Sequence, residues 1–150
     1  MIKELSPLVI LLVEDDPADQ KLIKISLREQ KLANDIYTVR SGEEGLDFLY
    51  HRGRYSDGTP RPDLILLDLN MPGIGGKEFL RQLKKDENLK QIPVVIVTTS
   101  EAEKDIIDSY KLQASGYVHK PVTLEGFKEA MKKLEEYWFV LCKRIPKEQP

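Results

Sequence analysis

The chain has 150 residues, of which 41% are hydrophobic and 32% are charged, so it has the composition of a globular protein with a core rather than of a disordered or fibrous chain. Its net charge of −2 predicts no strong attraction to nucleic acid or to an anionic membrane surface. The single cysteine, Cys142, excludes an intrachain disulfide and a multi-cysteine zinc site, and it favours a reducing, cytoplasmic location. No apolar run approaches the roughly 20 residues of a membrane span.

Short apolar runs alternate with helical patterns along the chain, which is typical of strand–helix units in a parallel sheet. The first predicted helix begins with Asp16 as its N-cap and Pro17 in its first turn. Ser41 and Glu44 form a capping box before the second helix. Further helices are expected after residues 73–76, after residue 100 and from Thr123 to about Cys142. Strands are expected at 8–13, 36–40, 64–68, 94–98 and 116–119.

These elements predict an α/β fold, a flavodoxin-like three-layer sandwich around a five-stranded parallel sheet in the order 2-1-3-4-5. We expect one domain over 1–150, with a core from about 8 to 142 and a polar tail at 143–150. The stretch 53–63 is rich in Gly and Pro and is expected to be a surface loop. The first helix carries two apolar rows at helical spacing, which are Ala18, Leu22, Ile25 and Ile23, Leu27.

Acidic side chains follow the two strands that are neighbours at the centre of this strand order. Glu14 and Asp15 end the first strand, and Asp68 ends the third. Ligands bind beyond the carboxyl ends of such strands, at the point where the strand order reverses. Three converging carboxylates repel one another, and a cation relieves that repulsion. Oxygen ligands without clustered His or Cys favour Mg²⁺, with Mn²⁺ as an alternative.

A carboxylate in this position can attack phosphorus, and Asp68 is the candidate nucleophile. The loop that follows it can bring a backbone carbonyl to the metal. Lys120 supplies a mobile positive charge, and Thr98 supplies a hydroxyl donor at the end of the fourth strand. Each residue alone has a simpler interpretation, since an Asp after a strand is usually a turn residue. The matching chemistry at four strand ends favours the site.

The runs VILLVEDD, LILLDLNMPGIGG, VVIVTTSEA and SGYVHKP resemble the motifs of the receiver domain of bacterial two-component response regulators, from about Val9 to Leu141. This resemblance implies a phosphoprotein whose phospho-acceptor is Asp68 and whose phosphoryl donor is a sensor histidine kinase. It implies that Asp15, Asp68 and the Asn70 carbonyl bind Mg²⁺, with Glu14 as the second member of the acidic pair. It also implies that Lys120 contacts the phosphoryl group and that Thr98 and Tyr117 are a switch pair.

The resemblance further implies that phosphorylation changes the face formed by the fourth helix, the fifth strand and the last helix. Partner binding and onward phosphotransfer both remain open as the output. The loop at 54–62, the TTS after the fourth strand and the aromatic last helix resemble single-domain regulators that serve bacterial phytochromes, so a phytochrome-like kinase is the expected partner. Three consecutive aromatic residues in the last helix indicate either an extension of the core or a surface for a homodimer or another partner, and they are Tyr137, Trp138 and Phe139.

Two other functions compete with a signalling domain that catalyses only its own phosphotransfer and dephosphorylation. A phosphatase of the haloacid dehalogenase type needs a second Asp two residues after the nucleophile, where this chain has Asn70. A flavin carrier of the flavodoxin type needs a Ser/Thr-rich phosphate loop after the first strand. There Glu14, Asp15 and Asp16 would repel a phosphate. Both alternatives are therefore weaker.

Overall fold

The computed structural model describes residues 8–29, 34–98, 108, 111–119 and 125. The expected helices after residue 100 and from Thr123, together with Lys120 and the Tyr137–Phe139 aromatics, lie outside the described residues. Within the described part of the chain, no helix is both long and apolar enough to span a bilayer. The elements, in chain order, are β1 (Leu8–Val13), α1 (Pro17–Glu29), β2 (Asn34–Val39), α2 (Gly42–Tyr50), the short 3₁₀ turn η1 (Gly53–Tyr55), β3 (Leu64–Leu67), α3 (Gly75–Lys85), β4 (Val94–Thr98) and β5 (Gly116–His119).

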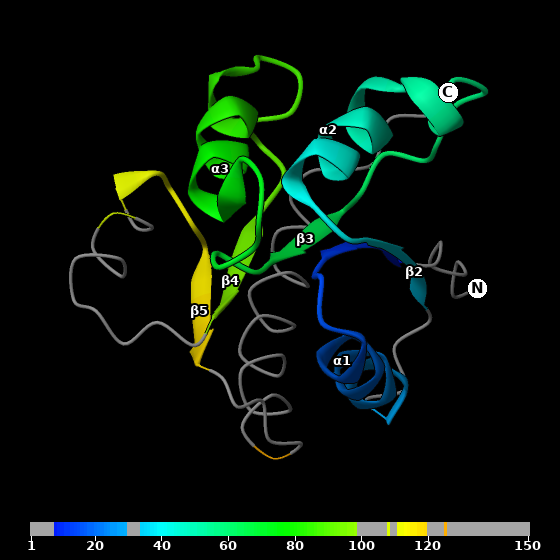
Figure 1. The fold of residues 1–150 in the computed structure, drawn as a ribbon, viewed down its shortest axis with the longest axis vertical. Coiled ribbons are helices and arrows are strands. Elements are labelled where there is room, and N and C mark those ends of the chain that lie inside the picture. The colour runs from blue at the N-terminus through cyan, green and yellow to red at the C-terminus, as the bar shows by residue number, and fades with distance from the viewer. Residues whose placement is uncertain (1–7, 30–33, 99–107, 109–110, 120–124, 126–150) are drawn as a thin grey trace, which may run out of the picture.

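The five strands form one parallel sheet in the order β2-β1-β3-β4-β5, which confirms the predicted order. In the register of the sheet, Val13 at the end of β1 lies opposite Leu67 at the end of β3. Leu67 in turn lies opposite Ile96, two residues before the end of β4. The residues that follow β1 and β3 therefore leave the sheet side by side, at its carboxyl edge (Figure 1).

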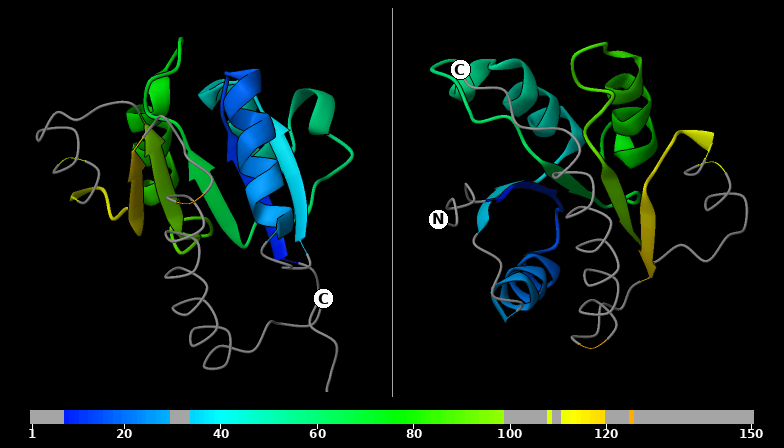
Figure 2. Two further views of the ribbon diagram at one scale, coloured as in Figure 1. Left: turned by 90° about the horizontal axis from the view of Figure 1, so that it is seen from below. Right: turned by 180° about the vertical axis from the view of Figure 1, so that it is seen from behind.

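Helices cover both faces of the sheet, which confirms the predicted three layers. Helices α2 and α3 lie on one face and α1 on the other (Figure 1). Figure 2 shows α1 lying along β1 and β2. The core is divided in the same way. Phe48, Phe79 and Leu83 pack against one face of the strands, and Ile23 and Leu27 pack against the other. All four residues of β3 are buried, as their continuous apolar character predicts for a central strand.

The predicted helix starts of α1 and α2 are confirmed, with one change in the second. Asp16 caps α1, since its Oδ1 accepts a hydrogen bond from the amide of Ala18 at 2.9 Å. Ser41 caps α2, and its hydroxyl accepts from the amide of Glu44 at 3.0 Å. A capping box would return Glu44 to the amide of Ser41. Instead, Oε1 of Glu44 accepts from the amide of Arg40, one residue earlier, at 2.9 Å.

The structure shows which residues of the two apolar rows of α1 face the sheet. Ile23 and Leu27 are fully buried and Leu22 is partly buried, whereas Ile25 is 38% exposed and Ala18 is exposed. A helix on one face of a sheet buries a single stripe, so one of two overlapping apolar rows must face outward. The second strand also begins earlier than predicted, at Asn34, and ends at Val39. The loop at 53–63 begins with η1, and its Pro62 is buried.

Candidate functional site

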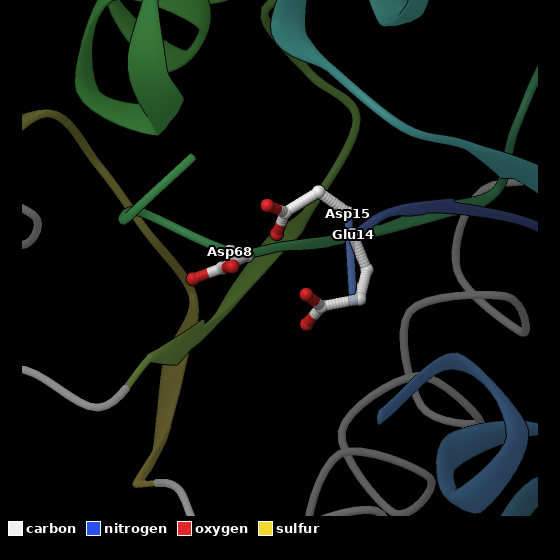
Figure 3. A group of neighbouring side chains, drawn as sticks. All are labelled: Glu14, Asp15 and Asp68. Carbon is white, nitrogen blue, oxygen red and sulfur yellow. The ribbon is translucent and has the colours of Figure 1, made fainter. Parts of the chain in front are cut away.

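Three carboxyl groups meet at the carboxyl edge of the sheet, as the strand order predicts. Glu14 and Asp15 directly follow β1, and Asp68 directly follows β3. One carboxylate oxygen from each residue lies within 4.8 Å of those of the other two. Figure 3 shows the three carboxyl groups near one another, with that of Asp15 above the ribbon and that of Glu14 below it in this view. Glu14 is 0% exposed and Asp68 is 3% exposed, while Asp15 is more open to solvent.

Main-chain hydrogen bonds hold two of these residues in line with the sheet. The amide of Glu14 donates to the carbonyl of Val39 at 3.0 Å, and the amide of Asp68 donates to the carbonyl of Val13 at 3.0 Å. Both bonds continue the ladder of the sheet one residue beyond the strands. Oε2 of Glu14 also accepts from the amide of Asp16 at 3.1 Å, in the turn that enters α1. These hydrogen bonds fix the main chain of Glu14 and Asp68, and with it the direction in which each buried side chain leaves the sheet.

Asn70 connects the third and fourth strand ends. Its amide N–H donates to Oδ1 of Asp68 at 3.0 Å, which closes the tight turn after β3. Its side-chain Nδ2 donates to Oγ1 of Thr98 at 2.8 Å, across 28 positions in the chain. Sequence reasoning placed the carbonyl of Asn70 at the metal but did not predict that its side chain contacts Thr98, because no spacing rule predicts a contact between this turn and the end of β4.

The expected switch residues lie on one face of the sheet. Thr98 ends β4, is 0% exposed, and by strand alternation shares a face with Ile96. Tyr117 pairs with Ile96 across β4 and β5 and packs, partly buried, against the same half of the core. The structure therefore brings Thr98, Asn70 and Asp68 together, and it places Tyr117 on the face that Thr98 occupies.

The loop between β3 and α3 packs tightly because several of its residues are glycines. Gly73 has a φ of +85°, which glycine adopts readily. A Cβ at Gly73 would lie 2.5 Å from Oε2 of Glu43, in the first turn of α2. A Cβ at Gly42 would lie 2.8 Å from the side chain of Ile74. The first turn of α2 thus supports the loop that carries Asn70.

The donor set is chemically suited to a divalent cation. It consists of carboxylate oxygens alone, and two of the three groups are buried. Among the described residues, no His or Cys belongs to this cluster. Hard cations such as Mg²⁺ and Mn²⁺ prefer oxygen ligands of this kind. Buried like charges at this separation also favour a compensating positive charge. The arrangement can therefore hold a cation beside a nucleophilic carboxylate.

Comparison with known proteins identifies the family. The model of the response regulator receiver domain matches residues 10–132, so the chain belongs to this family of two-component signalling proteins. The response regulator Rcp1 of Synechocystis is 40% identical over 132 residues, which are 88% of this chain and 89% of that protein. The chemotaxis protein CheY of Pseudomonas aeruginosa is 34% identical over 127 residues, which cover 85% of this chain and 95% of that protein.

Solved structures agree with this assignment. The phosphorylated cyanobacterial phytochrome response regulator RcpA is 41% identical, has a TM-score of 0.79, and is matched over 89% of this chain and 95% of that one. The Mn²⁺-bound form of Rcp1 is 38% identical, has a TM-score of 0.78, and is matched over 96% of this chain and 99% of that one. The chain is therefore a signalling domain of the class that accepts a phosphoryl group from histidine kinases, and its acidic cluster is of a kind that binds divalent metal.

Proposed function

We propose that Asp68 is the residue that receives the phosphoryl group. The observation that carries this proposal is the convergence of Glu14, Asp15 and Asp68 within 4.8 Å at the end of the central strands. Asp68 directly follows β3, the strand between β1 and β4, so it lies near both acidic residues and is connected to the hydroxyl of Thr98 through Asn70. Of the three carboxylates, it is the one whose turn residue, Asn70, also contacts Thr98.

In the proposed transfer, a carboxylate oxygen of Asp68 attacks the phosphorus of a phosphohistidine on the kinase. The new O–P bond forms as the P–N bond breaks, and the electron pair of that bond returns to the imidazole nitrogen. Later attack by water breaks the O–P bond, releases inorganic phosphate and regenerates the carboxylate. The domain thus catalyses its own phosphotransfer and dephosphorylation only. Thr98 donates a hydrogen bond to the phosphoryl oxygens, and Lys120 neutralises part of their charge.

We infer that Mg²⁺ is the cation of this site, held by Asp15, Asp68 and the main-chain carbonyl of Asn70, with Glu14 as the neighbouring acid. When bound, the ion supplies charge neutralisation and orientation of the phosphoryl oxygens. The support is the all-oxygen donor set, the burial of Glu14 and Asp68, and the similarity of the chain to Rcp1, whose solved structure is a Mn²⁺-bound form. Mn²⁺ should substitute for Mg²⁺.

The proposed output is a population shift. The phosphoryl group on Asp68 draws the side chain of Thr98 toward it. The side chain of Tyr117, on the same face of β4 and β5, then moves into the space that Thr98 leaves. The surface that changes is the one formed by β5 and by the helices that the sequence predicts before and after it. It then binds a partner or presents the phosphoryl group for onward transfer.

We infer that the kinase is of the phytochrome type and acts in the cytoplasm, where kinases of this class use ATP. The support is the similarity to regulators whose names connect them with phytochromes, including RcpA and the bacteriophytochrome response regulator AtBRR, which is 38% identical to this chain. Incubation with a phosphorylated phytochrome-type kinase should label the protein within seconds to minutes. An unrelated chemotaxis-type kinase at the same concentration should label it far more slowly.

We also propose a homodimer through the last predicted helix. Its support is the run Tyr137-Trp138-Phe139, because three consecutive residues of a helix point in different directions and cannot all face the core. Sedimentation equilibrium with beryllofluoride and Mg²⁺ should show a dimer that Trp138→Ala weakens. A monomer at the highest concentrations measured would exclude this assembly.

The central test is chemical labelling of Asp68. With acetyl phosphate and Mg²⁺, the wild-type protein should gain one phosphoryl group by intact mass, and Asp68→Asn should gain none. The matched control is Asp35→Asn, which removes an exposed carboxyl from the edge strand β2 and should label as the wild type does. Labelling that persists in Asp68→Asn would place the acceptor elsewhere. Steady release of phosphate from monoesters would instead indicate a phosphatase.

A further inference from the structure

The side chain of Asn70 contacts the hydroxyl that the proposed mechanism needs. Its Nδ2 donates to Oγ1 of Thr98 at 2.8 Å, while its main-chain N–H donates to Oδ1 of Asp68 at 3.0 Å. One residue therefore holds both the acceptor carboxylate and the switch hydroxyl, through two different donors. The main-chain bond is available to any residue at position 70 except proline. The side-chain bond depends on the carboxamide.

The polarity of the side-chain bond is chemically informative. An amide nitrogen can only donate, whereas a hydroxyl has one proton to donate and two lone pairs that accept. Oγ1 of Thr98 must therefore use a lone pair toward Asn70, and its proton points to a group other than Asn70. Phosphoryl oxygens only accept. The contact thus leaves Thr98 with the polarity that donation to a phosphoryl group on Asp68 requires.

The position of the contact is fixed from both ends. Thr98 is 0% exposed at the end of β4, so neighbouring groups enclose its side chain before any phosphoryl group is bound. Asn70 sits in the tight turn after β3, closed by its own amide on Asp68. An ordered donor on one side of the hydroxyl restricts the rotation of the threonine side chain, and ordering before the reaction removes an entropic cost from the bound state.

We propose that the Asn70 carboxamide is a positioning group that sets the location and polarity of the Thr98 hydroxyl beside the acceptor carboxylate. This role is separate from that of the Asn70 main-chain carbonyl, and it rests on the proposed function of Asp68 and Thr98. Asn70 acts through Thr98 and not by contact with the phosphoryl group. Its effect must therefore vanish when the hydroxyl is absent.

A double-mutant cycle tests this dependence, with beryllofluoride as the phosphoryl mimic at saturating Mg²⁺ and isothermal titration calorimetry as the readout. Asn70→Ala should weaken beryllofluoride binding about threefold to tenfold, the range expected for loss of one oriented hydrogen bond. Thr98→Val removes the hydroxyl and keeps the shape of the side chain. In the Thr98→Val background, Asn70→Ala should change the affinity by less than about twofold. Thr98→Ser retains the hydroxyl and should restore the full effect of Asn70→Ala.

Two further measurements separate positioning from a general loosening of the loop. Affinity for Mg²⁺ alone should stay within about twofold of the wild type in Asn70→Ala, because the main-chain carbonyl is retained. In NMR spectra, the side-chain amide protons of Asn70 should exchange slowly with water, and Thr98→Val should speed that exchange. This second readout requires neither metal nor phosphoryl mimic.

The outcomes distinguish the inference from the proposal on which it rests. An equal loss from Asn70→Ala in the wild-type and Thr98→Val backgrounds overturns the inference alone, as does the absence of any loss in the wild type. A wild-type protein that fails to bind beryllofluoride with Mg²⁺ overturns the proposed function, and the inference with it. Coupling that appears with Thr98→Ser and disappears with Thr98→Val supports both.

Discussion

The main chain of Asp68 lies directly against Gly76 in the first turn of helix α3. A Cβ at position 76 would come within 2.3 Å of the Asp68 carbonyl oxygen and 2.6 Å of the Leu69 Cα. The amide of Gly76 also donates to the carbonyl of Leu69 at 3.2 Å. Because the neighbouring atoms are backbone, they cannot swing aside as the end of a side chain can. Glycine at 76 therefore lets α3 begin against the turn that presents the acceptor carboxylate.

Gly76→Ala should destabilise the protein and displace Asp68. In an ordinary helix this substitution stabilises by up to about 1 kcal/mol, so a loss would identify the steric clash as the cause. We expect the free energy of unfolding to fall by about 1–3 kcal/mol, as for overpacking in a core. Labelling by acetyl phosphate should also slow.

Gly116→Ala is the control for this prediction. Its Cβ would make ordinary contacts with Val95, the nearest at 3.6 Å. Urea unfolding should show a much smaller change for Gly116→Ala than for Gly76→Ala. Equal and small changes in the two variants would mean that α3 shifts without cost.

Repulsion among the three carboxylates predicts opposite effects of one substitution with and without metal. Asp15→Asn should raise the stability of the metal-free protein, because it removes one of three converging negative charges. In the wild type, Mg²⁺ at about 100 times its Kd should stabilise by about 2.7 kcal/mol. Asp15→Asn should lose most of that gain.

Thermal unfolding with and without Mg²⁺ measures both effects. Asp57→Asn removes an exposed carboxyl from the loop after η1 and should respond to Mg²⁺ as the wild type does. If Asp15→Asn were stabilised by Mg²⁺ as strongly as the wild type, Asp15 would not be a ligand. If it were less stable than the wild type without metal, the carboxylates would not be in repulsion.

The meeting of Glu14, Asp15 and Asp68 could be predicted from the sequence because it depends only on strand order. Parallel strands end at the same edge, and β1 and β3 are neighbours in the order 2-1-3-4-5. Residues that directly follow those strands must then be close, whatever their rotamers. Backbone topology, which short apolar runs reveal, fixes this part of the site.

The contact between Asn70 and Thr98 could not be predicted in the same way, because it depends on the side-chain rotamers of a turn residue and a strand residue that are distant in sequence. The buried stripe of α1 was ambiguous for a related reason. Leu22 and Ile25 form one apolar row and Ile23 and Leu27 another, and periodicity alone cannot say which row meets the sheet. Tertiary packing decides both questions.

A charged cluster joins helix α2 to the loop that follows it. The hydroxyl of Tyr55 donates to Oε2 of Glu44 at 2.7 Å, and Arg54 lies 3.6 Å from the same oxygen. Burial and the hydrogen bond to Glu44 raise the pKa of Tyr55 to about 12. Burial raises the pKa of Glu44, but the hydrogen bonds from Tyr55 and the Arg40 amide outweigh it, so the pKa falls below its usual value.

Tyr55→Phe should lower the free energy of unfolding at neutral pH by about 0.5–1.5 kcal/mol through loss of this hydrogen bond. The raised pKa of Tyr55 means that the folded state keeps its proton longer than the unfolded state does. Its contribution is thus complete below pH 10.0, the usual value, and is lost as the pH rises toward about 12. The lowered pKa of Glu44 means that the contribution of its carboxylate to stability is complete above pH 4.5, the usual value. That contribution is lost as the pH falls through the lower pKa of the folded state.

Urea unfolding of the wild type and Tyr55→Phe as a function of pH checks these signs. The stability difference between them should be largest near neutral pH and should shrink in strong acid and strong base. Tyr37→Phe removes a phenol hydroxyl from a ring that also packs against Phe48, and it serves as the matched control. A difference that stays constant from acid to base would contradict the proposed coupling of Tyr55 with Glu44.

Lys84 ties the end of α3 to the chain entering β4. Its Nζ donates to the carbonyls of Lys90 at 2.9 Å and Ile92 at 3.2 Å, and burial lowers its pKa. Lys84→Met keeps the aliphatic stem and removes both bonds, so we expect a loss of about 1–3 kcal/mol at pH 7.

Because the folded-state pKa of Lys84 is below 10.5, the unfolded state binds more protons between the two values. The stability of the wild type relative to Lys84→Met should therefore rise with pH in that window. Urea unfolding at pH 7 and in that window, with the exposed Lys85→Met as control, measures both effects. A relative stability that falls with rising pH would show that the ammonium is favoured, not penalised, where it lies.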